Sequence, residues 1–300
     1  MTDQICVGQT VSANTEAYVH RFSTDGTLLQ VHDTGKVGTV GIQIATDSIG
    51  RFYVPIGRGA PNEGWVVRIN PSSGSTETFF TAPASHPAPR SVSLDSAGNA
   101  HILLTNLSTP AVRLVVLDPD GVQTSQLDLS ADILDPGPGG LVNTSGNRFY
   151  VSGLSQTPPN DGVISRYNLT TALPDGVFAQ EAISTFIPIG MRFRTSDAKL
   201  LVANERGSPV VVRLFAADGL SFTEFSYSVD ADPVDCDFSI DDDTIAYASD
   251  FTTYDVYRVN LTSGVVSVLF NTGFSNTLNM PITVVPAPSD IGRAWGHVIG

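Results

Sequence analysis

Hydrophobic residues in this chain occur in short runs that partly alternate with polar residues, and each run ends at a turn. Runs such as YVHRF, WVVRI, RLVVL and VVVRLF precede a short turn that contains glycine, and a second strand-like run follows each turn. A turn of this kind between two alternating runs is typical of a β-hairpin. The turn glycines recur 43 to 55 residues apart, at Gly26, Gly74, Gly121, Gly176, Gly219 and Gly264.

A second series of turns alternates with the first. It is flanked by runs such as GIQIAT and RFYVPI, or SVSL and HILL, and its turns lie at 48–50, 96–99, 145–147, 196–198, 241–243 and 289–292. Two hairpins in each repeat of about 47 residues give four strands per unit, which is the pattern of propeller blades. Helical periodicity is missing from the sequence. We therefore predict an all-β fold, a β-propeller of four-stranded blades.

The repeats divide residues 1–300 into six blades of a single domain. We expect five continuous blades at about 40–82, 90–130, 140–182, 190–229 and 234–270. The sixth is expected to be a composite blade, made from an N-terminal hairpin at 17–32 and a C-terminal hairpin at 281–299, with residues 1–16 as an N-terminal extension. Closing the ring in this way removes the exposed sheet edges that invite aggregation.

Two of the predicted hairpins share one sequence motif, an apolar run followed by Asp-x-x-Gly and a second apolar run. It is found as IATDSIGRFYV at 44–54 and as VSLDSAGNAHI at 92–102. This motif resembles the first hairpin of blades in the NHL and SMP-30/gluconolactonase-like group of six-bladed propellers. The resemblance covers most of the chain as architecture, and its motif describes a tight turn rather than a chemistry.

The resemblance also implies where a metal would bind. SMP-30-like lactonases hold a divalent cation with one acidic residue, two asparagine-type ligands and an aspartate, and oxygen ligands of this kind suit a calcium-like ion. Asp235 and Asn279 stand at plausible positions for two ligands, whereas Asn143 and Asn204 are less well placed. The early glutamate of that family has no match, since Glu16 and Glu63 lie in other surroundings. We therefore expect no cofactor, with one calcium-like cation as the alternative.

Propellers carry their functional groups at the ends of the central channel, where loops from all blades converge. The residues that lead into the innermost strands are expected to line this mouth, and the binding candidates are Thr39, Arg90, Arg192, Asp235 and Asn279. Histidine acts as acid or base in the lyase branch of the NHL-like group, and histidine is the natural proton carrier near neutral pH. His86, in a loop that leads to the channel, is therefore the catalytic candidate, together with Arg90.

The formal net charge of −14 argues against nucleic acid as a partner, because phosphate contacts need a basic surface. Many aspartates stand beside glycine in the predicted turns, where the side chain bonds local backbone N–H groups. We interpret the acidity, including the run 241–243, as turn chemistry. No apolar stretch approaches the 18 residues of a membrane span, and the N-terminal residues lack the pattern of a secretory signal.

Cys6 and Cys236 are expected to be two separate buried thiols, although a disulfide between them stays open. Aromatic residues on the third and fourth strands of the blades are expected to pack between neighbouring sheets, with a subset left for a partner surface. They are Trp65, Phe79, Phe80, Tyr167, Phe222, Phe225, Tyr254 and Tyr257.

No nucleophile elbow, phosphate loop, zinc-type cluster or dinucleotide fingerprint occurs in the sequence. We therefore expect a non-enzymatic structural or binding module of a larger assembly, whose partners are other proteins of that assembly or a surface glycan. The expected assembly is a virion, at the tail or capsid surface of a bacteriophage, and otherwise the protein is expected in the cytoplasm. The alternative is a metal-dependent hydrolase, a lactonase, or a lyase of the SMP-30/NHL propeller type.

Overall fold

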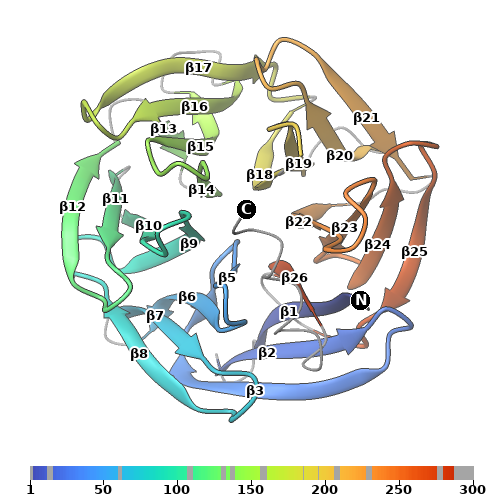
Figure 1. Cartoon of the computed structure of the whole chain (residues 1–300), viewed down its shortest axis with the longest axis horizontal. Helices are drawn as coiled ribbons and strands as arrows, with labels where there is room; N and C mark the ends of the chain where they lie inside the picture. Colours follow the sequence, from blue (N-terminus) through green and yellow to red (C-terminus); the bar gives the residue numbers. More distant parts are fainter. Residues whose placement is uncertain are drawn as a thin grey trace.

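The computed structural model describes residues 3–11, 16–59, 63–106, 111–129, 133–135, 139–155, 161–184, 186–194, 196–205, 210–227, 232–275 and 280–286. All the secondary-structure elements in these ranges are β-strands, and they form six antiparallel sheets. The sheets stand around a central axis as a six-bladed β-propeller (Figure 1). The predicted fold class is therefore confirmed. The described part of the chain contains no helix that is long and apolar enough to cross a membrane.

We number the blades from the one that closes the ring, and give the strands of each from the axis outward. Blade 1 consists of β26 (Ile282–Pro286), β1 (Asp3–Val11), β2 (Glu16–Ser23) and β3 (Leu28–Val37). Blade 2 begins with the short strands β4 (Thr39–Val40) and β5 (Ala45–Thr46), followed by β6 (Phe52–Gly59), β7 (Glu63–Ile69) and β8 (Thr76–Thr81). Blade 3 consists of β9 (Ala88–Leu94), β10 (Ala100–Asn106), β11 (Ala111–Leu117) and β12 (Gln123–Asp128).

The other three blades repeat this order. In blade 4, β13 (Ile133–Asp135) and β14 (Gly140–Val142) both pair with β15 (Arg148–Ser155), and β16 (Gly162–Asn168) and β17 (Leu173–Glu181) follow. Blade 5 consists of β18 (Pro188–Phe193), β19 (Leu200–Asn204), β20 (Val210–Phe215) and β21 (Phe222–Ser226). Blade 6 consists of β22 (Pro233–Phe238), β23 (Ile245–Asp250), β24 (Asp255–Asn260) and β25 (Val266–Asn271).

Blade 1 is composite, as expected, but its strands are shared differently between the two ends of the chain. β26 is the one described strand from the C-terminal end, and β1 pairs with it along the register Gln4↔Val285 and Cys6↔Thr283. Residues 3–11 are therefore the second strand of the closing blade, and not part of an extension. β1 escapes a pattern search because both of its faces are buried, so its polar and apolar positions hardly alternate in exposure. Residues 294–299, expected as the last strand of the hairpin, lie outside the described residues.

The core of the molecule lies between the blades. Six clusters of buried side chains each join two neighbouring sheets. On β10, for example, Ile102 and Leu104 pack with blade 2, whereas Leu103 packs with blade 4. Tyr167, Tyr257 and Phe225 are buried in this way, and Phe222 is 40 % exposed, which agrees with the expectation that most aromatics pack between sheets.

Aspartate side chains organise the turns between the first and second strands. Asp95 Oδ1 accepts the backbone N–H groups of Ala97 and Asn99, both at 2.9 Å. Asp47 Oδ1 does the same for Ile49 at 3.1 Å and Arg51 at 2.9 Å. The glycines of these two turns have φ of 83° and 81°, a backbone conformation that residues with a Cβ rarely adopt. Much of the negative charge thus belongs to the turns, as the sequence predicted.

Candidate functional site

Side chains fill the middle of the channel. Ile42 of blade 2, Ile189 of blade 5 and Val234 of blade 6 form a buried apolar cluster, against which Ile187 and Phe251 pack. These residues come from opposite sides of the ring and meet at the axis. We call this cluster the apolar plug. It fixes the distance between inner strands that share no sheet.

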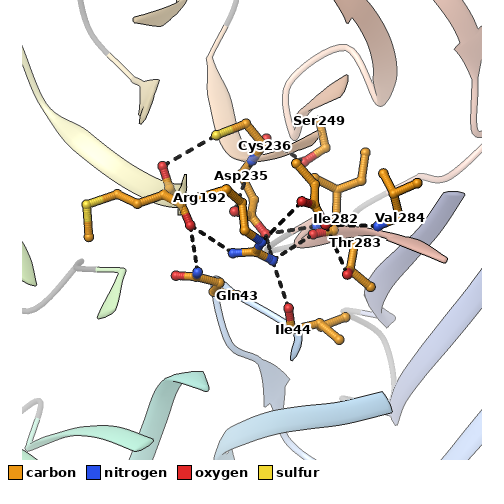
Figure 2. A network of polar contacts seen from close by, with 12 residues as sticks. Gln43, Ile44, Arg192, Asp235, Cys236, Ser249, Ile282, Thr283 and Val284 are labelled. Atoms are coloured by element: carbon orange, nitrogen blue, oxygen red, sulfur yellow. Dashed lines mark hydrogen bonds and ion pairs between the residues drawn. The ribbon is translucent and has the colours of Figure 1, made fainter. Parts of the chain in front are cut away.

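A polar layer lies next to the apolar plug, and Gln43 crosses it. The Gln43 side chain is buried, and its Nε2 donates to the Met191 carbonyl oxygen at 2.7 Å (Figure 2). Its Oε1 has no hydrogen-bond partner among the described residues. Gln43 thereby joins blade 2 to blade 5 across the axis.

Arg192, on β18, is the hub of the polar layer. Its Nη1 donates to the Met191 carbonyl oxygen at 2.9 Å, and its Nη2 donates to the carbonyl oxygens of Ile44 at 2.8 Å and Ile282 at 3.2 Å (Figure 2). Its Nη2 lies 3.7 Å from Asp235 Oδ2, and its Nε lies 3.5 Å from Asp237 Oδ1. One guanidinium therefore holds the inner strands of blades 1, 2, 5 and 6 together.

Asp235 is the most deeply buried charged group of this layer. Its Oδ1 accepts the Cys236 N–H at 2.9 Å, and its Oδ2 accepts the Ile282 N–H at 3.0 Å. Burial raises the pKa of Asp235 to about 7, although the Arg192 guanidinium and both N–H donors pull it down. Burial by itself lowers the pKa of Arg192, but the carboxylates of Asp235 and Asp237 outweigh that effect and raise it.

The carboxylates of β22 also close the ring. Asp237 Oδ2 accepts the Val284 N–H at 2.9 Å and the Thr283 hydroxyl at 3.1 Å. From the other side of the same seam, Asp3 accepts the Ile240 N–H at 3.1 Å and the Tyr247 hydroxyl at 2.9 Å. This seam between blades 6 and 1 is where the two ends of the chain meet, and charge-assisted hydrogen bonds of this kind are the strong ones.

A pocket of about 500 Å³ opens where the innermost strands finish. We call it the exit-mouth pocket. All six blades contribute to its wall, which combines apolar side chains with a few polar ones: Gln43, Ile44, Ala45, Thr46, Asp47, Val92, Ser93, Leu94, Leu141, Arg192, Asp237, Ile240, Thr283, Val284 and Pro286. The sequence directed attention to the opposite, upstream ends of these strands.

The structure brings two of the five expected mouth residues together, Arg192 and Asp235. Thr39 pairs with Gly57 in blade 2, and Arg90 gives its backbone carbonyl to the Ile42 N–H at 2.6 Å. Neither residue lines the exit-mouth pocket. Asn279 lies outside the described residues.

His86 lies between β8 and β9, near the charged residues Arg113 and Asp128 of blade 3. Its Nδ1 is 3.1 Å from the Ser85 hydroxyl, and its side chain is buried. Burial lowers the pKa of His86, and the nearby Arg113 on β11 lowers it further, while Asp128 on β12 opposes them. These neighbours belong to the third and fourth strands of the blade. The catalytic candidate from the sequence is thus placed away from the polar layer.

The implied metal ligands fit a metal ion poorly. Both oxygens of Asp235 accept backbone N–H groups, and a guanidinium lies beside one of them. Asn143 Oδ1 accepts two backbone N–H groups of its own turn, and Asn204 Oδ1 accepts the Ile187 N–H at 2.8 Å. Within the described ranges, no three His, Cys, Asp or Glu side chains form a group that could hold a metal ion.

Cys6 and Cys236 are free thiols, both buried. They belong to different interblade clusters, between blades 1 and 2 and between blades 5 and 6. This agrees with the expectation of two separate thiols. Burial raises the pKa of both.

Gln43 is the functional-site residue that the sequence analysis missed. Its one signal is a long polar side chain in the middle of the apolar run GIQIAT. A polar residue at such a position needs a buried partner, and that partner, the Met191 carbonyl, lies 148 positions away.

Comparison with known proteins supports the fold. No protein-family model matches the sequence, and no curated protein matches it. Among solved structures, a chain of the nidogen/laminin complex matches with a TM-score of 0.68 and 14% identity, over 93% of this chain and 98% of that one. TolB from Acinetobacter baumannii matches with a TM-score of 0.68 and 10% identity, over 95% and 67%.

A third similar structure is a putative 6-phosphogluconolactonase from Bacteroides fragilis, with a TM-score of 0.57 and 16% identity, over 89% of this chain and 80% of that one. Likeness at these identities concerns architecture, since one propeller fold carries many unrelated functions. The comparisons and the sheet topology agree that the chain is a six-bladed β-propeller.

Proposed function

We propose that this propeller is a non-enzymatic structural or binding module of a larger assembly. The observation that carries the proposal is the state of the polar groups at the channel centre. Arg192 and Asp235 bind one another and the backbone of blades 1, 2, 5 and 6. Their hydrogen-bonding capacity holds the ring together, so little is left for a substrate.

Catalysis by an acid or base needs a group within hydrogen-bond reach of the substrate. Asp235 has no exposed surface, and its two oxygens already accept N–H donors. His86, the other candidate, lies near Arg113 and Asp128, which belong to the two outer strands of blade 3. Neither group is presented to a ligand in the exit-mouth pocket.

The rim of the disc supports a protein as the partner. β3, the outermost strand of the closing blade, exposes four aliphatic side chains: Leu28 at 49%, Leu29 at 45%, Val31 at 47% and Val37 at 49%. Apolar groups gathered on a surface favour contacts with other proteins over contacts with a glycan. As in the sequence analysis, we propose a virion as this assembly, with the exposed aliphatic side chains of β3 in contact with another of its proteins.

The experiment must separate this function from a metal-dependent hydrolase or lactonase of the SMP-30/NHL type. We would sediment the protein from an extract of the organism that makes it, and measure divalent metal content and lactone hydrolysis of the purified chain. If the protein is a binding module, it sediments as a particle much heavier than the 31.8 kDa of one chain. The wild-type chain then hydrolyses lactones no faster than the Asp235→Asn variant. Asp120→Asn, at an exposed turn position, is the matched control.

Two results would overturn the proposal. One is a protein that sediments only as a free monomer. The other is lactone hydrolysis that depends on a stoichiometric divalent ion and is lost in Asp235→Asn but kept in Asp120→Asn.

A further inference from the structure

The exit-mouth pocket has the size and wall of a site for a small molecule. Its volume is about 500 Å³, and ligand sites are mostly clefts of about 300–1,000 Å³ with apolar walls and a few polar groups. Leu94, Leu141 and Val284 belong to the apolar wall. Ile240 also lines the pocket and is 41% exposed, so it forms part of the rim. The polar groups of such a pocket decide which molecule it binds.

The two carboxylates of the pocket wall have their oxygens engaged. Asp237 Oδ2 accepts two donors of β26, and its Oδ1 accepts an N–H of β22 at 2.9 Å and lies 3.5 Å from Arg192 Nε. Asp47 Oδ1 accepts two N–H groups of its own turn, and its Oδ2 accepts the Arg51 Nε–H at 2.7 Å and the Tyr53 hydroxyl at 3.4 Å. A carboxylate has about four acceptor sites. A donor on a ligand therefore finds no free acceptor site on either group.

Two donors of the wall, in contrast, have a hydrogen to spare. Three of the five N–H groups of Arg192 bind carbonyl oxygens and Nε–H faces Asp237 (Figure 2). One N–H of its Nη1 is thus unpartnered among the described residues. Ser93 Oγ accepts the Val142 N–H at 3.0 Å, and within the described ranges its O–H donates to no group. Both residues line the pocket, so a carbonyl oxygen is the complementary ligand group.

Gln43 does not change this balance of donors and acceptors. Its Oε1 has no hydrogen-bond partner in the described part of the chain, but that atom is buried. It lies beside Gly139 of blade 4, where an added Cβ would come within 3.2 Å of it. A ligand in the pocket therefore meets the donors of Arg192 and Ser93 first.

Charge excludes the ionic alternatives. Arg51 compensates Asp47, whereas Arg192 alone faces both Asp235 and Asp237, and the acidic turn 241–243 follows the rim at Ile240. A carboxylate or phosphate ligand would thus enter a region of net negative charge. A cation would lose its water without gaining a free acceptor, which costs free energy. A neutral molecule meets neither obstacle.

We propose that the exit-mouth pocket binds a small neutral molecule that carries a carbonyl oxygen on an apolar body. The apolar part packs against Leu94, Leu141 and Ile240. The oxygen accepts a hydrogen bond from one of the two unpartnered donors, at Arg192 or Ser93. This inference goes beyond the assembly function, which sedimentation tests and which does not depend on a ligand in this pocket.

Methyl NMR of the full chain tests the proposal with three probes that share one alkyl chain: methyl hexyl ketone, heptanoate and heptylammonium. The ketone is expected to shift the methyl signals of Leu94, Leu141 and Ile240 in a saturable way. Val122 and Leu173, which are 61% and 60% exposed and lie outside the pocket, should not shift. We expect the ketone to bind roughly tenfold or more tightly than either charged probe, because those leave a buried donor unpaired or meet the wrong charge.

A charge placed on the rim gives a second measurement. Ile240→Lys adds a positive charge at the pocket and is expected to strengthen the binding of heptanoate several-fold. Val122→Lys is the matched control, because it changes the net charge equally at an exposed position away from the pocket, and it should leave all three affinities unchanged.

Three results would overturn the proposal. The first is a ketone that shifts no pocket methyl, or that shifts pocket and outer methyls alike. The second is a charged probe that binds the wild-type chain as tightly as the ketone. The third is an affinity for heptanoate that Ile240→Lys and Val122→Lys change equally.

Discussion

Replacing Arg192 by methionine removes the hub of the channel while keeping an unbranched side chain of similar length. Three backbone carbonyls, those of Ile44, Met191 and Ile282, lose their guanidinium donor. Asp235 stays buried without its nearest positive charge. Taking away one partner of a buried ion pair costs about 3–5 kcal/mol, because the remaining charge is left uncompensated.

The cost is expected to depend on pH. The pKa of Asp235 is about 7 in the folded protein and 3.8 in the unfolded chain, so the stability linked to its proton is present below 3.8 and lost as pH rises through 7. Without Arg192 the folded pKa rises further, because the attraction that lowered it is gone. The variant therefore loses more stability at pH 8 than at pH 6, where Asp235 takes up a proton.

Urea or thermal unfolding at the two pH values measures the effect. For 300 residues, the unfolding entropy is about 0.6 kcal/mol per kelvin, so a loss of 3–5 kcal/mol lowers Tm by about 5–8 °C. A double-mutant cycle with Asp235→Asn is expected to show coupling of at least about 1 kcal/mol and little dependence on pH in the double variant. The reasoning is refuted if Arg192→Met unfolds within about 1 kcal/mol of the wild type at both pH values, or if the two substitutions are additive.

Three further predictions concern the closing blade and the thiols. Burial lowers the pKa of His32 to about 4, so the folded protein loses stability as pH falls from 6.5 to 4. Between pH 7 and pH 4.5, the free energy of unfolding in urea should therefore fall by about 2 kcal/mol less in His32→Leu than in the wild type. Equal losses in the two proteins would contradict this. Val284→Pro removes the N–H that Asp237 accepts across the seam between blades 6 and 1, so amide exchange should speed up in β1 and β26 well before blades 3 and 4. Uniform acceleration would show that the seam is no local weak point. Cys6 and Cys236 are fully buried, and their pKa values are raised. A thiol reagent at pH 8 should therefore label neither cysteine until the protein unfolds. Prompt labelling of the native protein would show that the interblade clusters that contain them open.

The local parts of this fold were within reach of the sequence. Hairpins at Gly50 and Gly98 depend on an Asp that binds N–H groups two and four residues later. These interactions involve neighbours in the chain, so period-two patterning and turn chemistry suffice to predict them. The count of six blades follows because the same local unit repeats.

The candidate site was predictable only in fragments. Arg192 and Asp235 stood out as charged residues near inner strands, but nothing in their surroundings shows that they meet, since they are brought together by packing of blades 5 and 6. Gln43 looked like part of an ordinary strand. The placement of β1 beside β26 joins residues more than 270 positions apart, such as Cys6 and Thr283, and both faces of β1 are buried, which removes the alternation that marks a half-exposed strand.

The sequence by itself determined the repeat, the turns and the class of fold, because each is set by interactions within a few residues. The tertiary structure decided how the ring closes, that the charged groups near the axis bind the backbone of neighbouring blades, and that the pocket lies at the downstream ends of the inner strands. These features depend on six strands from the whole chain meeting around one axis, and no single stretch of sequence carries that geometry.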